Sequence, residues 1–267
     1  MRDLDKSSPI LLFDSGVGGL TVYDALRKLL PQAPVIYAAD LAGLPYGTKT
    51  EAQIAARVAG LLGRMTERYQ PRLACIACNT ASTIALGMVR DVLEVPVVGT
   101  VPAIKPAAAL TRTGTIGLVG TEATIRQAYV DDLEARFAAD KRLLRIAAPG
   151  LVAAAEAKLR GQPVDPAPIA EIAARLAAMP GGAEIGTLVL ACTHFPLLAE
   201  ELGQAFGAHV AQVDGADGIA RRIADLLDGQ SFAQSGPNRF VVTGPLEGAR
   251  GLDNALSARG FGAAEAF

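Results

Sequence analysis

Short apolar stretches alternate with segments of helical spacing along most of the chain, and this alternation restricts the folds open to it. Residues 9–13 are apolar and lead into the glycine-rich turn 14–19, after which residues 20–30 carry apolar side chains at helical spacing. Three more apolar stretches follow, at 34–40, 73–77 and 96–100. Because strands that alternate with helices form parallel sheets, this part of the sequence predicts an α/β fold with a parallel sheet.

A second series of the same kind begins at residues 113–125. It continues through an apolar stretch at 143–149 and a helix near 166–178, and it returns to an apolar stretch at 187–198. Repetition of one pattern indicates either duplication or convergence on the same strand order. We therefore expect two pseudo-symmetric α/β lobes, each built on a parallel sheet.

The last part of the chain is expected to return to the first lobe. Residues 209–227 contain no cysteine, and a tail strand is predicted at 240–244. We expect the first lobe to comprise residues 1–101 plus 214–267, and the second lobe to comprise residues 102–213. The first domain is then discontinuous in sequence.

Composition and charge favour a globular protein that acts on a small molecule. The 267 residues are 51% hydrophobic, and the formal charge of −2 comes from scattered side chains that form no basic stripe for nucleic acid. No run approaches the roughly 18 apolar residues of a membrane span, and the N-terminal residues lack the apolar segment of a secretory signal. We expect a cytoplasmic protein with no nucleic-acid or membrane partner, whose three cysteines are free thiols.

Two cysteines follow apolar stretches at matching points of the two series. Cys78 precedes Asn79 and Thr80, and Cys192 precedes Thr193 and His194. In parallel α/β sheets, ligands bind beyond the carboxyl ends of the strands, where helix N-termini face outward. Inversion of a carbon centre by proton transfer needs an acid/base group on each face of the substrate. The matched cysteines therefore predict a two-base thiol site, as in a racemase or epimerase.

The third cysteine, Cys75, forms a Cys-x-x-Cys pair with Cys78, a spacing that also occurs in redox and zinc sites. On a strand the two residues would lie about 10 Å apart at roughly 3.3 Å per residue, too far to share a metal or a disulfide. We expect Cys75 to pack in the core. A zinc site formed by Cys78, Cys192 and His194 stays open as an alternative, although we expect no metal.

Two further residues are candidates for proton transfer. His194 lies close enough in sequence to Cys192 to exchange protons with the thiol or the substrate, and the alternative is a solvent-facing histidine at a helix start. Asp14 ends the first apolar stretch and is also a candidate N-cap of the following helix. The other histidine, His209, is expected at the surface, at the start of a strand.

The sequence offers no cofactor-binding motif. The turn 15–19 could be taken for a dinucleotide-binding loop with Asp40 as the ribose-binding acid, but Thr21 occupies the place of the third glycine. No Walker loop is present, and no lysine lies in a context typical of a pyridoxal phosphate site. We expect chemistry without a cofactor.

Several motifs in order resemble the cofactor-independent glutamate racemases. They are FDSGVGGLTV (13–22), PYG (45–47), CNTAST (78–83), VPVVGTVPAIKPA (95–107) and ACTHFPLL (191–198). The resemblance extends over most of the chain. Within the broader aspartate, glutamate and hydantoin racemase superfamily, the turn 14–19 and the PYG loop point to the glutamate branch.

The resemblance implies two lobes with the active site in the cleft between them, and interconversion of L- and D-glutamate. Cys78 and Cys192 would be the acid/base thiols, with Asp14 and His194 as helpers in proton transfer. The implied substrate contacts are Asp14, Ser15, Tyr46, Gly47, Asn79, Thr80, Thr193 and His194, with Thr121 and Thr124 at the carboxylate end. The resemblance also implies a homodimer, and a role in supplying D-glutamate for peptidoglycan precursors.

The chain departs from the family pattern at a few positions. Gly43 stands where the family often has Arg, and Phe195 stands where it often has Tyr. Ala148 and Ala153 replace a Cys and a Pro, while Glu156 is retained as a candidate helper. We expect these departures to change loop packing and to leave the chemistry unchanged.

Three other functions compete with glutamate racemisation. A racemase of aspartate or hydantoins would use the same thiol pair. A catalytically idle amino-acid-binding protein would bind its ligand without exchanging the α-proton. A decarboxylase of the same superfamily would not need both thiols.

Overall fold

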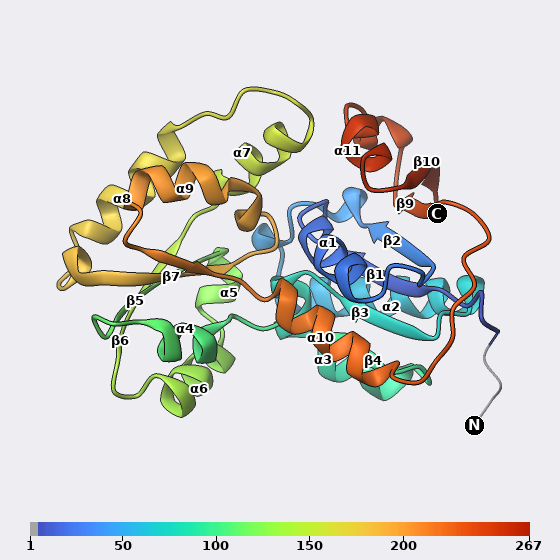
Figure 1. Cartoon of the computed structure of the whole chain (residues 1–267), viewed down its shortest axis with the longest axis horizontal. Helices are drawn as coiled ribbons and strands as arrows, with labels where there is room; N and C mark the ends of the chain where they lie inside the picture. The colour runs from blue at the N-terminus through green and yellow to red at the C-terminus, as the bar shows by residue number, and fades with distance from the viewer. Residues whose placement is uncertain (1–4) are drawn as a thin grey trace. The chain divides into compact units, whose positions relative to one another are not determined.

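The computed structural model describes residues 5–267 (Figure 1), and the chain divides into two compact units. Unit 1 comprises Met1–Thr100 and Ala216–Phe267, and unit 2 comprises Val101–Gly215. Each unit contains one sheet whose described strand pairs are all parallel. The predicted α/β fold with two parallel sheets is therefore confirmed.

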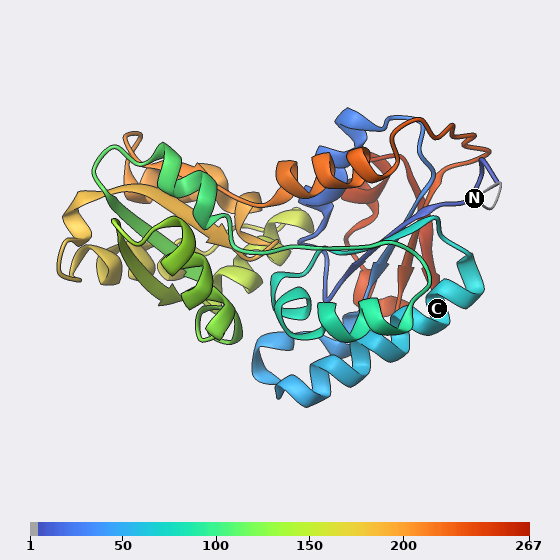
Figure 2. The same cartoon turned by 90° about the horizontal axis from the view of Figure 1, so that it is seen from below.

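Unit 1 is built on a six-stranded sheet in the order β10-β9-β2-β1-β3-β4. Its strands are β1 (Ile10–Asp14), β2 (Val35–Ala39), β3 (Leu73–Ile76), β4 (Val97–Gly99), β9 (Asn238–Val242) and β10 (Phe261–Ala266). Its helices are α1 (Leu20–Leu29), α2 (Glu51–Tyr69), α3 (Asn79–Val92), α10 (Ala216–Leu226) and α11 (Asp253–Ser257), with short 3-10 turns η1 (Leu41–Gly43), η2 (Tyr46–Thr48) and η5 (Leu246–Ala249). Helix α1 packs on α10 and α2 packs on α3, with α10 and α2 on opposite faces of the sheet (Figure 2).

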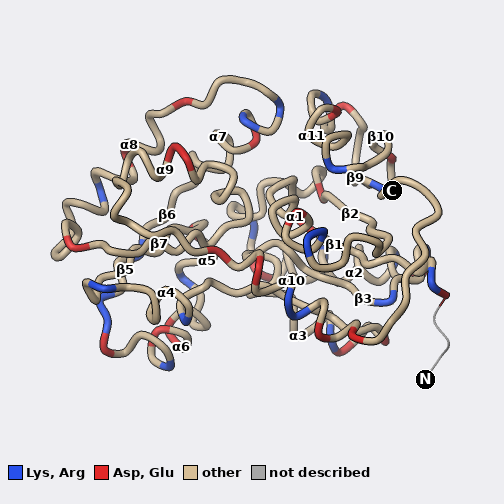
Figure 3. Tube along the Cα trace, in the orientation of Figure 1, with Lys and Arg blue, Asp and Glu red and all other residues tan. Residues whose placement is uncertain are grey.

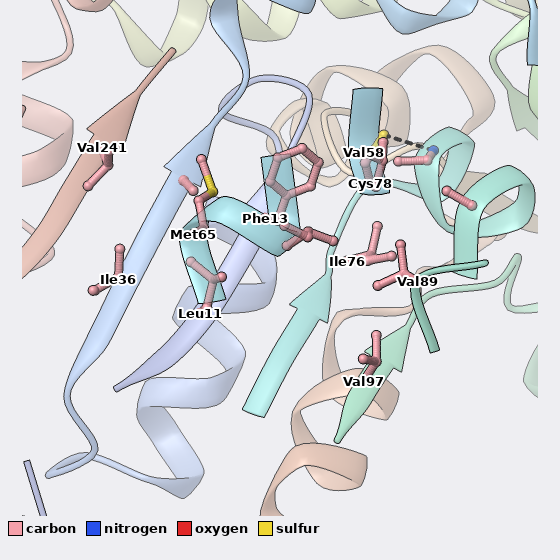
Figure 4. Packing of buried hydrophobic residues seen from close by; sticks show 14 of the residues in the cluster. Leu11, Phe13, Ile36, Val58, Met65, Ile76, Cys78, Val89, Val97 and Val241 are labelled. Atoms are coloured by element: carbon pink, nitrogen blue, oxygen red, sulfur yellow. Dashed lines mark hydrogen bonds between the residues drawn. The ribbon is translucent and has the colours of Figure 1, made fainter. Parts of the chain in front are cut away.

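Helix α2 shows how the sequence builds one face of this core. Thr50 caps its N-terminus by accepting a hydrogen bond from the Gln53 backbone N–H at 3.2 Å, and the Gln53 side chain accepts one from the Thr50 N–H at 3.0 Å. The buried side chains of α2 recur every three or four residues, so they form one apolar stripe. Figure 4 shows Val58 and Met65 of this stripe packed with Phe13 of β1 and with residues of β3 and α3.

Unit 2 is built on a four-stranded sheet in the order β6-β5-β7-β8. Its strands are β5 (Thr115–Gly120), β6 (Arg142–Ala147), β7 (Ile185–Ala191) and β8 (Ala211–Val213). Its helices are α4 (Ile104–Leu110), α5 (Glu122–Ile125), α6 (Ala128–Phe137), α7 (Gly150–Leu159), α8 (Ala167–Ala177) and α9 (Ala199–Phe206), with 3-10 turns η3 (Gly182–Glu184) and η4 (Phe195–Leu198). One apolar cluster joins the sheet to α7, α8 and α9, and a second joins it to α4 and α6.

The two sheets repeat one strand order. In unit 1 the run β2-β1-β3-β4 places the first strand between the second and the third, and in unit 2 the run β6-β5-β7-β8 does the same. Strand β3 therefore corresponds to β7, and β1 corresponds to β5. The predicted pseudo-symmetry of the two lobes is confirmed at the level of topology, while β9 and β10 extend the sheet of unit 1 only.

Two strands in the last part of the chain bear on the expectations for this region. The segment 211–213 pairs with β7 as β8, and the return to unit 1 begins with α10. Strand β10 was not predicted at all. It is an edge strand made of Gly, Ala, Glu and one Phe, and most of its residues are partly exposed, so it lacks the apolar run that marks the central strands.

Charged side chains of both signs are interspersed along the helices and loops of each unit (Figure 3). Within residues 5–267, none of the helices combines the length and the apolar character needed to cross a membrane.

We expect truncation in the centre of β1 to destabilise unit 1. Leu12 is fully buried, so Leu12→Ala removes apolar contacts and leaves a cavity, at a cost of about 2–5 kcal/mol. Leu246→Ala is the matched control, because Leu246 is 46% exposed and should cost close to nothing. Thermal unfolding midpoints measure both effects. Equal midpoints for the two variants would contradict the placement of β1 at the centre of the core.

Candidate active site

Cys78 lies where β3 ends and α3 begins. It is the N-cap residue of α3, and its Sγ accepts a hydrogen bond from the Ala81 backbone N–H at 3.4 Å (Figure 4). Cys78 is buried, with 5% of its surface exposed, and it packs in the apolar cluster of unit 1. A helix N-terminus stabilises negative charge, so this position favours the thiolate form of Cys78.

Asp14 and Ser15 at the end of β1 lie beside this thiol. The Ser15 hydroxyl is 3.4 Å from Cys78 Sγ. The fully buried Asp14 carboxylate accepts hydrogen bonds from the Ser15 backbone N–H at 2.7 Å, the Gly19 N–H at 2.5 Å and the Tyr37 hydroxyl at 3.2 Å. Asp14 therefore fixes the turn that presents Ser15 to the thiol.

The expectation that Asp14 caps α1 is wrong. Asp14 is the last residue of β1, and the N-cap residue is Gly19, whose N–H donates to the Asp14 carboxylate. This close approach needs glycine, because a Cβ at position 19 would lie 3.0 Å from Asp14 Oδ2 and 2.9 Å from the Tyr37 hydroxyl.

Tyr46 in η2 is anchored by a buried carboxylate, Asp40. The Tyr46 hydroxyl donates to Asp40 Oδ2 at 2.5 Å, and Arg57 and the Thr243 hydroxyl donate to the same carboxylate. Burial opposes ionisation, but the hydrogen bonds from Arg57, Thr243 and Tyr46 hold the pKa of Asp40 below its ordinary value. Burial and the charges of Asp40 and Cys78 raise the pKa of Tyr46, so it stays a neutral phenol.

The remaining predicted residues of unit 1 lie at the same edge of the sheet. Asn79 and Thr80 are the first two residues of α3, and both are buried. The Thr100 hydroxyl donates to Asn79 Oδ1 at 3.5 Å. Gly47 follows Tyr46 in η2, which packs against α3.

Unit 2 brings Cys192, His194 and Glu156 together. Cys192 follows β7, and its Sγ lies 3.8 Å from Nδ1 of His194. The other ring nitrogen of His194, Nε2, lies 3.0 Å from Glu156 Oε1 on α7. Cys192 and His194 are 7% and 2% exposed, so the alternative of a solvent-facing His194 is wrong. The thiol, imidazole and carboxylate form one chain of contacts.

Glu156 is held as a carboxylate by two neighbours. Burial alone would raise the pKa of its carboxyl, but the hydrogen bonds and charges of His194 and Arg160 keep that pKa below its ordinary value. Arg160, one helical turn further along the chain, donates to Glu156 Oε2 at 2.9 Å. When His194 is neutral, an ionised Glu156 favours the tautomer with the proton on Nε2, which leaves the Nδ1 lone pair facing Cys192.

The other residues named in unit 2 lie in three places. Thr193 is buried between Cys192 and His194. Thr121 and Thr124 follow β5, the counterpart of β1, and their hydroxyls lie 2.9 Å apart while Thr121 caps α5. His209 is exposed just before β8, as expected.

Cys75 is fully buried within β3, which confirms its predicted place in the core. Burial raises the pKa of its thiol, so it stays protonated and unreactive. Residues 5–267 contain no group of three or more Cys, His, Asp or Glu side chains that could hold a metal ion.

Each unit therefore presents one thiol at the same topological place, the end of the strand that follows the central one. The sequence motifs named both thiols, Asp14 and His194 as candidates. They missed the partners of Asp40, and they gave Glu156 no defined contact. Glu156 was named only because the family pattern retains it, and its i,i+4 spacing to Arg160 was a further signal in the sequence. Nothing in the sequence connects Arg57 to Asp40.

Comparisons with known sequences all indicate the same protein family. The sequence model described as Asp/Glu/Hydantoin racemase matches residues 18–223. The glutamate racemase of Sphingopyxis alaskensis is 64% identical over 225 residues, which are 84% of this chain and 84% of that protein.

Solved structures agree as well. The Escherichia coli glutamate racemase in complex with L-glutamate and the activator UDP-MurNAc-Ala aligns with a TM-score of 0.90 and 42% identity, over 97% of this chain and 98% of that one. The glutamate racemase of Thermus thermophilus in complex with β-chloro-D-alanine aligns with a TM-score of 0.76 and 33% identity, over 99% and 98% of the two chains.

The contacts of Glu156 predict a specific pH dependence of stability. The pKa of Glu156 in the folded chain lies below its ordinary value of 4.5, so ionised Glu156 stabilises the fold above that pH. This contribution is lost as the pH falls through the folded-state pKa. We expect Glu156→Gln to lower the thermal unfolding midpoint at pH 7 and to flatten its decline below about pH 4.5.

The matched control is Glu200→Gln on α9, since Glu200 is exposed. Its midpoint should follow that of the native chain at each pH. Parallel curves for the native chain and Glu156→Gln would show that the ionisation of Glu156 contributes nothing to stability.

Proposed function

The chain belongs to the aspartate, glutamate and hydantoin racemase family, as its motifs predicted, and from this we propose that it interconverts L- and D-glutamate. The family makes it a racemase, which is an isomerase. The choice of glutamate is supported by the identity to glutamate racemases and by the likeness to an enzyme solved with L-glutamate. The observation that carries the mechanism is the matched placement of Cys78 and Cys192 after corresponding strands.

In unit 2, the contact chain prepares Cys192 to exchange a proton. With Nε2–H donated to Glu156, Nδ1 of His194 can take the proton of the thiol at 3.8 Å and leave a thiolate. The same imidazolium can later return that proton. Glu156 does not reach the thiol, so we assign it a positioning role, with Arg160 keeping it ionised.

In unit 1, the thiol of Cys78 has different support. The Ala81 N–H and the helix N-terminus stabilise the thiolate, and the Ser15 hydroxyl can donate to it at 3.4 Å. Both oxygens of Asp14 already accept hydrogen bonds from the turn and from Tyr37. Asp14 therefore acts through Ser15 and the geometry of the turn.

The reaction consists of one proton removal and one proton return. The thiolate on one face takes the α-proton, and the electron pair of the C–H bond stays on the substrate as a carbanion next to its carboxylate. The thiol on the opposite face donates its proton to the same carbon and becomes a thiolate. Backbone N–H groups and hydroxyls at the strand ends stabilise the charge that develops on the carboxylate. The reverse reaction exchanges the two roles.

The wider context is proposed on the resemblance alone. D-Glutamate would serve peptidoglycan precursors, which are made in the cytoplasm, and the chain would act as a homodimer. Sedimentation equilibrium tests the dimer directly. Racemisation of aspartate or hydantoins, and ligand binding without turnover, are the competing functions.

We expect the purified protein to racemise L-glutamate with no added cofactor. The loss of optical rotation from L-glutamate, and its equal loss from D-glutamate, measures this activity. L-Aspartate and a 5-substituted hydantoin in parallel reactions separate the competing racemases. Turnover of either of these in preference to glutamate would contradict the proposed substrate, and glutamate binding by calorimetry without turnover would indicate the binding protein.

We expect Cys78→Ala and Cys192→Ala each to lower kcat by about 10²–10⁴-fold, the usual contribution of an acid/base group. Cys75→Ala is the matched control, because Cys75 is a buried thiol of the same unit as Cys78 with no place in the chemistry. It should keep kcat and lose only stability. Full turnover by a folded Cys78→Ala or Cys192→Ala protein would contradict the two-thiol mechanism.

A further inference from the structure

We propose that Arg57 and Gly43 position the substrate-binding loop at residues 44–47, with Arg57 acting through Asp40 on Tyr46 and Gly43 keeping the space that this contact needs. The proposal rests on the proposed function, because it takes that loop as a substrate contact. Neither residue belongs to a motif that pointed to the site. Both act on a substrate-binding element without touching the thiol.

Asp40 is the centre of this contact. It follows β2, its side chain is fully buried, and its backbone N–H donates to the Asp14 carbonyl at 2.8 Å. Arg57 on α2 donates to both carboxylate oxygens, from Nε at 2.5 Å and from Nη2 at 2.6 Å. This paired geometry orients the carboxylate as well as neutralising it, which a single point charge would not do.

The oriented carboxylate in turn fixes Tyr46. Oxygen Oδ2 of Asp40 accepts the Tyr46 hydroxyl at 2.5 Å, and the Tyr46 ring is 2% exposed within the same apolar cluster as Cys78. The turn η2 that carries Tyr46 and Gly47 packs against α3, which begins just after Cys78. The guanidinium of Arg57 thus acts through two short hydrogen bonds on a loop next to the thiol.

Gly43 leaves the space in which Arg57, Asp40 and Tyr46 meet. A Cβ at this position would lie 2.6 Å from Arg57 Nε and 2.8 Å from Tyr46 Cε1, and closer still to Asp40 Oδ2. All three partners of the contact therefore occupy the space that a side chain at position 43 would need. In this chain, a side chain at position 43 therefore requires one or more of these three partners to shift.

The test compares Arg57→Ala, Gly43→Ala and the double variant with the native enzyme. The loop would contact glutamate both before and during proton transfer, so misplacing it weakens binding throughout. We expect each single variant to raise KM for both enantiomers by about tenfold to 100-fold with little change in kcat. Because both substitutions break one contact, the double variant should be no worse than the more damaged single variant.

Two controls lie on the same helix, α2. Arg64→Ala removes an exposed guanidinium, and Gly60→Ala adds a Cβ that meets nothing within 4 Å. Both should keep the native KM. A merely structural role of Arg57 would lower the fraction of active protein, and therefore kcat, at unchanged KM. If Arg57→Ala does not fold, Arg57→Lys and Gly43→Ala replace it in the test. The KM of Arg57→Lys should then lie between the KM of the native enzyme and that of Gly43→Ala.

A second readout does not depend on activity. Amide hydrogen exchange of residues 41–49 should be faster in Arg57→Ala and Gly43→Ala than in the native protein and the two controls. If the native protein fails to racemise glutamate, the proposed function fails, and this readout still reports on the loop. An unchanged KM with native exchange rates in folded Arg57→Ala, or additive effects in the double variant, would overturn the proposal.

Discussion

The positions of both thiols follow from one constraint of parallel α/β structure. Each strand ends, and the helix after it begins, at the same edge of the sheet. At that edge the chain leaves backbone N–H groups without partners in the sheet, and a side chain placed there meets the positive end of a helix. Cys78 takes this position as the N-cap of α3. Cys192 follows β7, the counterpart of β3 in the second sheet, and is supported by an imidazole instead.

The two units surround these equivalent thiol positions with different side chains. In unit 1 buried carboxylates organise the loops, with Asp14 holding the turn at Ser15 and Asp40 holding Tyr46. In unit 2 the buried carboxylate lies on a helix, where Glu156 contacts His194. Burial makes each carboxylate costly unless its oxygens accept hydrogen bonds, so each one rigidly fixes the groups around it. A common topology thus places the two thiols among different neighbours.

The sequence predicted what depends on local pattern and missed what depends on packing between distant elements. Central strands buried on both faces are apolar runs, so the strand positions and their repetition were visible, whereas the edge strand β10 is built largely of Gly and Ala and was not. Strand-end residues such as Asp14, Cys78 and Cys192 follow those runs directly. The contact of His194 with Glu156 spans 38 residues, and that of Arg57 with Asp40 spans 17, and each depends on how a helix packs. Those contacts required the structure.

The measurement that most directly tests the proposed two-thiol mechanism is the isotope content of both enantiomers when L-glutamate reacts in heavy water, sampled at low conversion. The mechanism predicts D-glutamate that carries deuterium at the α-carbon, while the remaining L-glutamate still carries protium. The donating thiol has exchanged with solvent, and the abstracted proton stays on the other thiol. D-Glutamate that retains protium, or equal deuterium in product and remaining substrate, would point to a single base serving both faces and would contradict the two-thiol mechanism.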